Sequence, residues 1–186
     1  MVKVGFICEG LTEVLLIESD DFQKLLKQLG IQYTKAINAK GNKNLISTNI
    51  KPFVEDLESL NSEIIFVLTD LDSNESMENL KKEIIETDNL IIVIAVKQVE
   101  SWFLADSTLL TKLLGEPFEF NFPENEEIPF ETLRKLLIKF KGRGIPAKVP
   151  MALKMLNNGF SIQNAANHPN CPSAKYFLTK LQSIEI

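Results

Sequence analysis

The sequence predicts an α/β fold of three layers: a mostly parallel sheet of about four strands between helices, followed by a small helical C-terminal extension. Three observations lead to this class. Apolar runs of strand length alternate with helical patterns through the first 97 residues. Two of these runs are continuous and rich in β-branched residues, as expected for parallel strands buried on both faces. After residue 100 the patterns are short and helical. Such an order favours right-handed crossovers with helices on both faces of the sheet.

The first elements follow from apolar spacing and from the positions of glycine and proline. We expect a strand, a helix, a weaker strand and a second helix, over residues 2–8, 12–29, 32–37 and 45–60. Gly10 breaks the first apolar run, and Gly30 is a natural helix stop. Pro52 starts or kinks the second helix, because proline is tolerated only in the first turn.

The later elements complete the sheet and then change character. We expect a strand, a polar-faced helix and a strand over residues 63–69, 75–86 and 90–96. A helical turn over residues 101–105 follows, and Asp106 caps a helix that runs to residue 114. The next stretch has three prolines and no clear period, which predicts a loop. We therefore divide the chain into an α/β domain, residues 1–115, and a helical extension packed on it, residues 116–186.

Composition indicates a soluble cytoplasmic protein. The chain has 186 residues, 45% hydrophobic content and a net charge of −5, all ordinary for a globular domain. Cys8 and Cys171 are too few for a disulfide scaffold and indicate reduced thiols. The N-terminus starts directly as a strand, without the architecture of a signal peptide. The longest apolar runs fall short of the roughly 20 residues that a membrane helix needs.

Carboxylates stand where three of the predicted strands end. They are Glu9, Glu13, Asp70, Asp72 and Glu100. In an open α/β sheet the crevice outside the carboxyl ends of the strands is where ligands bind. A cluster of acids there repels itself unless a cation neutralises it, and oxygen ligands suit Mg²⁺ or Mn²⁺. The pattern therefore predicts a metal site that acts on phosphates.

The acids differ in how easily another role explains them. Asp70 and Asp72 are two apart on a strand, so both project to one side, although turns and caps also favour aspartate. Glu9 precedes Gly10 and is a metal ligand or a general acid/base. Glu13 is a site residue or simply a favourable charge in the first turn of a helix. Glu100 is a further ligand or a water-orienting base.

Two other groups of residues are not expected in the site. The apolar residues after Glu100, which are Trp102, Phe103 and Leu104, are expected in the core. His168 and Cys171 supply two ligands, which do not close a zinc site. The spacings of the dinucleotide-binding and P-loop signatures and of the hydrolase nucleophile elbow do not occur.

Basic residues gather in two places that could meet phosphate. Residues 131–157 carry seven bases and one acid, and within them the run KFKGRGIPAK forms a glycine-containing basic loop. From this segment we single out Lys141, Arg143 and Lys148 as phosphate ligands. Lys40 and Lys43, in the loop NAKGNKN, are further candidates. A solvated helix face is the alternative explanation of the basic segment.

At these acids the chain resembles the Toprim superfamily, the catalytic domain shared by topoisomerases, bacterial primases and overcoming-lysogenization-defect nucleases. The matching residues are Glu9, Gly10 and Glu13 after the first strand, and Asp70 and Asp72 after the third. The segments VESWFLAD and CPSAKYF extend the similarity to small stand-alone Toprim-like proteins. The resemblance implies a Toprim-like fold in which strands one and three are neighbours. It also implies Mg²⁺-dependent cutting or joining of nucleic acid, with Glu9 as acid/base and Asp70 and Asp72 as metal ligands.

The resulting expectation is a metal-dependent nuclease, in phage defence or DNA repair. Its partners would be nucleic acid and an ATPase protein, because this chain has no ATPase module of its own. Two alternatives stay open: a binding module for nucleic acid or protein with a structural metal, and a small-molecule phosphohydrolase. Haloacid-dehalogenase phosphohydrolases carry their Asp-x-Asp pair on the first strand, whereas here the pair follows the third.

Overall fold

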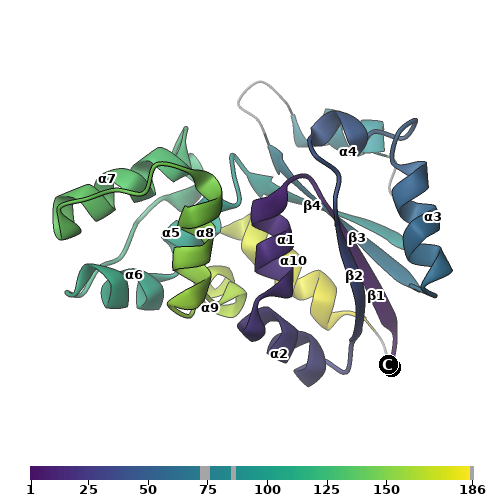
Figure 1. The fold of residues 1–186 in the computed structure, drawn as a ribbon, viewed down its shortest axis with the longest axis horizontal. Helices are drawn as coiled ribbons and strands as arrows, with labels where there is room; N and C mark the ends of the chain where they lie inside the picture. Colours follow the sequence, from purple (N-terminus) through teal and green to yellow (C-terminus); the bar gives the residue numbers. More distant parts are fainter. Residues whose placement is uncertain (72–75, 85–86, 185–186) are drawn as a thin grey trace.

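A computed structural model describes residues 1–71, 76–84 and 87–184 of the chain. Its centre is a four-stranded parallel sheet in the order β2-β1-β3-β4, which Figure 1 shows between helices. The strands are β1 Lys3–Cys8, β2 Gln32–Asn38, β3 Ile64–Leu71 and β4 Leu90–Val96. This arrangement confirms the predicted α/β class. It also confirms that the first and third strands are neighbours, since Val4 to Cys8 pair in register with Ile64 to Leu68.

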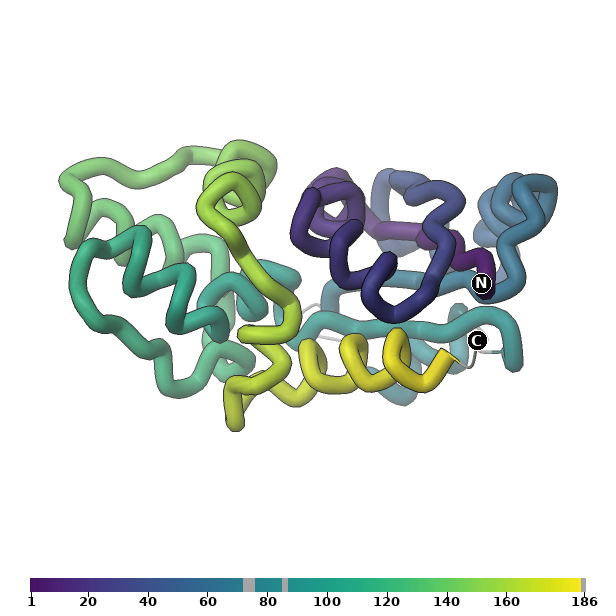
Figure 2. The backbone as a smooth tube through the Cα atoms, turned by 90° about the horizontal axis from the view of Figure 1, so that it is seen from below, coloured from purple at the N-terminus to yellow at the C-terminus, as the bar shows by residue number. Residues whose placement is uncertain are grey.

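Helices cover both faces of the sheet and form a separate group at one end. The helices that precede β4 are α1 Leu11–Glu18, α2 Asp20–Gln28, α3 Lys51–Ser59 and α4 Met77–Ile84, with the 3-10 turn η1 Asn42–Asn44. Those that follow β4 are α5 Glu100–Ala105, α6 Ser107–Leu114, α7 Pro129–Lys141, α8 Lys148–Asn157, α9 Ile162–Asn167 and α10 Pro172–Gln182, with η2 Pro123–Asn125. Figure 2 shows that α10, in yellow, leaves this group and runs back along the sheet.

Alternation along the strands supplies a separate core on each face. Phe6 and Phe66 point to the face covered by α1, α2 and α10, where their rings stack 5.6 Å apart. Ile7 and Val67 point to the opposite face and pack with side chains of α3 and α4. All four are fully buried, and burial of each contributes about 1.5–3 kcal/mol relative to exposure. Burial on both faces explains why these strands are continuously apolar.

The segment predicted as one helix over residues 12–29 is two helices, so this expectation was wrong in detail. Ser19 breaks it with extended backbone angles, φ −64° and ψ 148°. Its hydroxyl accepts a hydrogen bond from the Phe22 N–H at 3.4 Å and caps α2. Apolar spacing continues across the break, which conceals it in the sequence. Pro52 does start a helix, since α3 begins at Lys51.

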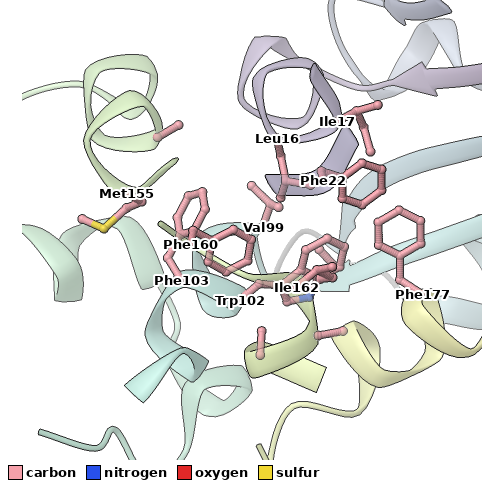
Figure 3. Close-up of a cluster of buried hydrophobic side chains, with 14 of the residues drawn as sticks. Leu16, Ile17, Phe22, Val99, Trp102, Phe103, Met155, Phe160, Ile162 and Phe177 are labelled. Carbon is pink, nitrogen blue, oxygen red and sulfur yellow. The ribbon is translucent and has the colours of Figure 1, made fainter. Parts of the chain in front are cut away.

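The group of helices at the end of the sheet is continuous with the sheet's core. Trp102 and Phe103 of α5 are buried, as expected, and Figure 3 shows them between the two parts. The Trp102 ring stacks on Phe177 of α10 at 5.6 Å, and Phe103 meets Phe160 edge-on at 4.8 Å. Helix α5 therefore anchors both groups of elements.

Among the described residues, no helix combines the length and apolar character that a membrane crossing requires. Cys8 and Cys171 are both buried and free of any disulfide. Asp106 caps α6 as predicted, because its carboxylate accepts a hydrogen bond from the Leu109 N–H at 3.0 Å.

Candidate functional site

Four of the predicted acids meet at the carboxyl edge of the sheet. Glu9 follows β1 directly, and its backbone N–H donates to the Leu68 carbonyl of β3 at 2.9 Å. Asp70 is the second-to-last residue of β3, Glu13 lies in the first turn of α1, and Glu100 begins α5. The parallel sheet places β1 and β3 side by side, so their ends bring these carboxylates together.

Glu9 and Asp70 are joined by a direct hydrogen bond. The Glu9 Oε2 accepts from the Asp70 backbone N–H at 3.1 Å and from the Thr69 hydroxyl at 2.6 Å. These two donors fix the Glu9 carboxylate against the neighbouring strand while the residue stays partly exposed. Glu9 is thus held and still accessible from solvent.

Glu13 closes the start of α1 and faces the other acids. Its Oε2 accepts from the Gly10 N–H at 3.0 Å. Only 5% of the residue is exposed. Burial, together with the charges of Glu100 and Glu9, raises the pKa of Glu13 to about 6. A side chain on Gly10 would place its Cβ 3.1 Å from the Glu13 Oε2, so glycine leaves room for this capping bond.

Asp70 connects β3 to the start of α5. Its Oδ1 accepts from the Val99 N–H at 2.8 Å, which ties the turn after β4 to the end of β3. The residue is buried. Burial and the nearby charge of Glu13 raise the pKa of Asp70 well above its usual value, and the ammonium of Lys148 offsets part of that rise.

Glu100 is the most buried of the acids. It has no exposed surface, and neither of its carboxylate oxygens has a hydrogen-bond partner among the described residues. Burial raises the pKa of Glu100, although Lys148 acts in the opposite direction. A buried carboxylate without a hydrogen-bond partner is costly, so Glu100 is a candidate for a functional role.

Lys148 is the basic residue that reaches these acids. It is the first residue of α8, and its Nζ lies 3.7 Å from both the Asp70 Oδ2 and the Glu100 Oε2. Burial lowers the pKa of Lys148, but the charges of Glu100 and Asp70 outweigh that effect and the pKa is raised. Its side chain is 43% exposed, so one side of the ammonium faces solvent.

The other predicted basic residues take no part in these two ion pairs. Lys40, Lys43, Lys141 and Arg143 are exposed, and no ion pair forms between any of them and another described residue. Lys40 lies in the loop after β2, and Lys43 lies in η1. Lys141 and Arg143 lie at the end of α7 and in the connection to α8.

The donor set has the chemistry of a site for a hard divalent cation, but the described part of the chain does not form a finished cage. The donors are all carboxylate oxygens, and those of Glu100 are buried without a hydrogen-bond partner among the described residues. Within residues 1–71, 76–84 and 87–184, however, no three acidic, histidine or cysteine side chains are arranged to hold a metal ion. Asp72, the other predicted metal ligand, lies outside the described residues.

Two contributions to the site were missed in the sequence. The Thr69 hydroxyl holds Glu9, and the Val99 N–H holds Asp70. The threonine directly before Asp70 was a visible signal, because a hydroxyl beside a strand-end acid can bond to a neighbouring carboxylate. A backbone N–H leaves no such signal. His168 takes no part: its Nδ1 accepts from the Asn170 N–H at 3.1 Å, and its Nε2 lies 3.9 Å from Glu119.

The fold and the site define an α/β domain with an acid-rich carboxyl edge. The chain belongs to the DUF4276 family, described as a domain of unknown function, whose model matches residues 8–182. A search of curated proteins gives no match.

Two solved structures are similar over nearly the whole chain. The C-terminal region of the Burkholderia pseudomallei OLD protein has 14% identity and a TM-score of 0.44, covering 97% of this chain and 99% of the other. The C-terminal region of the Xanthomonas campestris pv. campestris OLD protein has 17% identity and a TM-score of 0.40, covering 96% and 93%.

Proposed function

We propose that this protein is a Toprim-type nuclease that cuts phosphodiester bonds in nucleic acid with Mg²⁺ or Mn²⁺. The observation that carries the proposal is the group formed by Glu9, Glu13, Asp70, Glu100 and Lys148 at the carboxyl edge of the sheet. Three of these carboxylates have raised pKa values, and burial is the first cause in each case. Perturbed acids clustered at a strand edge are typical of functional sites.

In this proposal Glu9 is the general acid/base. Its Oε2 is engaged by Thr69 and by the Asp70 amide, which leaves the other oxygen to exchange a proton with water or with the leaving oxygen. Hydrogen bonds from two donors hold the carboxylate in place, so a water between Glu9 and a substrate phosphate would meet it in a fixed orientation.

Asp70 and Asp72, with Glu9, would hold the cation. When bound, the ion would neutralise the acids and polarise the phosphate as a Lewis acid. Glu13 and Glu100 would favour binding of the cation without contacting it, since their buried carboxylates add negative potential at this edge. Lys148 would stabilise the charge that develops on the phosphate, because its ammonium already lies beside Asp70 and is open to solvent on one side.

Nucleic acid is the proposed partner. The exposed residues Lys40, Lys43, Lys141 and Arg143 would contact its phosphates, with Lys148 nearest to the reaction. An ATPase protein is a further proposed partner, following from the resemblance to overcoming-lysogenization-defect nucleases, in which the catalytic domain works beside an ATPase.

One observation favours a second candidate, a binding module without catalysis. Lys148 places a protein cation between Asp70 and Glu100, so part of the charge that a metal would neutralise is already balanced. In such a module the acids and Lys148 would form a structural ion-pair network.

The experiment is a cleavage assay on labelled single- and double-stranded DNA and RNA with Mg²⁺, Mn²⁺ or EDTA. Wild type is compared with Glu9→Gln, Asp70→Asn and Asp72→Asn, and with Glu58→Gln as a control on the exposed surface of α3. The nuclease predicts cutting that needs metal and is lost in the three site variants while Glu58→Gln cuts normally. Binding of nucleic acid without cutting under any of these conditions would contradict the nuclease and favour the binding module.

A further inference from the structure

Two lysines adopt a backbone conformation that lysine rarely takes. Among the described residues, those other than glycine with positive φ are Lys40 at 62°, Asn61 at 60° and Lys97 at 64°. Asparagine visits this left-handed region readily, whereas lysine is held there at a cost of about 1 kcal/mol or more. Asn61 lies before β3, at the amino edge of the sheet, and both lysines lie just after a strand, at the carboxyl edge.

Lys97 is the centre of a tight turn between β4 and α5. The Gln98 N–H donates to the Val96 carbonyl at 2.9 Å, two residues back. With a positive φ at Lys97 this is a γ-turn of the rare, strained kind. The turn delivers the Val99 N–H to the Asp70 carboxylate at 2.8 Å, so it supports the site directly.

Lys40 occupies the corresponding place after β2. Its N–H donates to the Asn38 Oδ1 at 2.8 Å, and the next residue, Gly41, donates to the Glu9 carbonyl at 2.8 Å. The turn at Lys97 therefore leads directly to a hydrogen bond with the Asp70 carboxylate, and the turn at Lys40 leads directly to one with the Glu9 carbonyl. Glycine or asparagine could make either turn with less strain, so the backbone at these two positions does not itself require a lysine.

The sheet order sets where the two charges lie. Because the order is β2-β1-β3-β4, the inner strands end in Glu9 and Asp70, and the outer strands end near Lys40 and Lys97. Lys40 is exposed and Lys97 is partly exposed, and neither ammonium pairs with a described acid. Two unpaired cations thus flank the acids, one on each side.

We propose that Lys40 and Lys97 bind two separated phosphates of one polynucleotide, which they hold across the acids. Adjacent strands are about 4.8 Å apart, so the ends of β2 and β4 are separated by about 14 Å. That distance equals about four base-pair rises along the axis of B-form DNA. The substrate is therefore a chain of several nucleotides, because a mononucleotide cannot contact both lysines. This inference rests on the proposed function and adds Lys97 to its binding residues.

The test measures binding of a fluorescein-labelled DNA duplex and of its single strand by anisotropy, across a salt series and with Ca²⁺ in place of Mg²⁺. The variants are Lys40→Asn and Lys97→Asn, which keep the turns and remove the charges, and Lys40→Arg and Lys97→Arg, which keep the charges. Lys3→Gln is the matched control, because Lys3 begins β1 at the opposite edge of the same sheet. Thymidine monophosphate serves as the mononucleotide competitor.

Each asparagine variant should weaken binding by about 3- to 10-fold and reduce the salt slope by about 0.9 for the duplex or 0.7 for the single strand. The double variant should lose both increments, the arginine variants should retain them, and Lys3→Gln should match wild type. Wild-type binding with an unchanged slope in the double variant overturns the inference and leaves the nuclease intact. An equal loss for the mononucleotide overturns the two-phosphate span. Absence of polynucleotide binding by wild type overturns the inference and the proposed function together.

Discussion

The carboxylate of Glu9 accepts the backbone N–H of Asp70 at 3.1 Å, so the acids at the ends of two neighbouring strands share one hydrogen-bonded unit. The parallel register of β1 and β3 produces this contact, since Cys8 pairs with Leu68 and the Glu9 N–H donates to the Leu68 carbonyl. A shift of one residue in either strand would turn the acids to opposite faces of the sheet. The site is therefore a direct consequence of strand pairing.

The Thr69 hydroxyl should be necessary for the position of Glu9. Thr69→Val keeps the shape of the side chain and removes the 2.6 Å bond to the Glu9 Oε2. We expect the free energy of unfolding to fall by about 1 kcal/mol and metal-dependent cutting to fall more than tenfold. Urea denaturation and the cleavage assay measure the two effects. Thr179→Val, on the exposed side of α10, should change neither. Normal cutting by Thr69→Val would show that Glu9 needs no such support.

Lys148 should stabilise the acids in the protein without metal. Lys148→Ala removes the ammonium that lies 3.7 Å from Asp70 and Glu100. Because the lysine is partly exposed and solvent screens the pair, we expect a loss of only about 1 kcal/mol at pH 7 in EDTA. Added Mg²⁺ should restore part of that stability if a cation binds the same acids. Lys154→Ala, further along α8, is the control. Equal melting temperatures for the two variants would argue against a stabilising role.

Glu13 should make the protein more stable as the pH falls from 7 towards 5. Its folded-state pKa is about 6 against an ordinary 4.5, so the folded state binds the proton more tightly than the unfolded state. The ionised carboxylate then costs up to about 2 kcal/mol above pH 6, and this cost disappears below about pH 4.5. Glu13→Gln should therefore raise the free energy of unfolding at pH 7 and change it little at pH 4.5.

The measurement for Glu13 is urea denaturation in EDTA at a series of pH values, with Glu78→Gln in the first turn of α4 as the control. The difference between Glu13→Gln and wild type should grow as the pH passes from 5 to 7. A constant difference over that range would mean that Glu13 titrates normally in the folded protein.

The sequence was sufficient for the sheet and for where its acids gather. The predicted strand over residues 90–96 coincides with β4. It could be predicted because a continuous β-branched run between polar turns is typical of a buried strand. The strand-end rule for parallel sheets predicted that the acids gather at one edge, and the resemblance to the Toprim superfamily implied that the strands before Glu9 and Asp70 are neighbours. The division at residue 115 and the metal roles of Asp70 and Asp72 stay predictions.

Long-range pairings were beyond sequence patterns. Lys148 was predicted as a phosphate ligand from its basic segment, but its contact with Asp70 crosses 78 positions and depends on how α8 packs beside α1. Nor does periodicity reveal that α10 returns to the sheet, where Phe177 stacks on Trp102. The strained turn at Lys97 has no sequence signature either. Turns with a positive φ are normally predicted from glycine or asparagine, and this one has lysine.

Ser173 should hold the returning α10 against α5 and η2. Its hydroxyl accepts the Trp102 indole N–H at 2.7 Å and donates to the Glu124 Oε1 at 2.5 Å, and all three residues are buried. Ser173→Ala leaves the indole N–H without an acceptor, so we expect a loss of about 1–3 kcal/mol in the free energy of unfolding. Trp102 is the single tryptophan of the chain, so its fluorescence emission reports unfolding in urea. In the folded state, the emission of Ser173→Ala should be shifted relative to that of wild type. Ser183→Ala, exposed at the end of α10, should behave as wild type. Equal stability of the two serine variants, with unchanged emission, would mean that stacking of Trp102 on Phe177 is enough to fix α10 without this hydrogen bond.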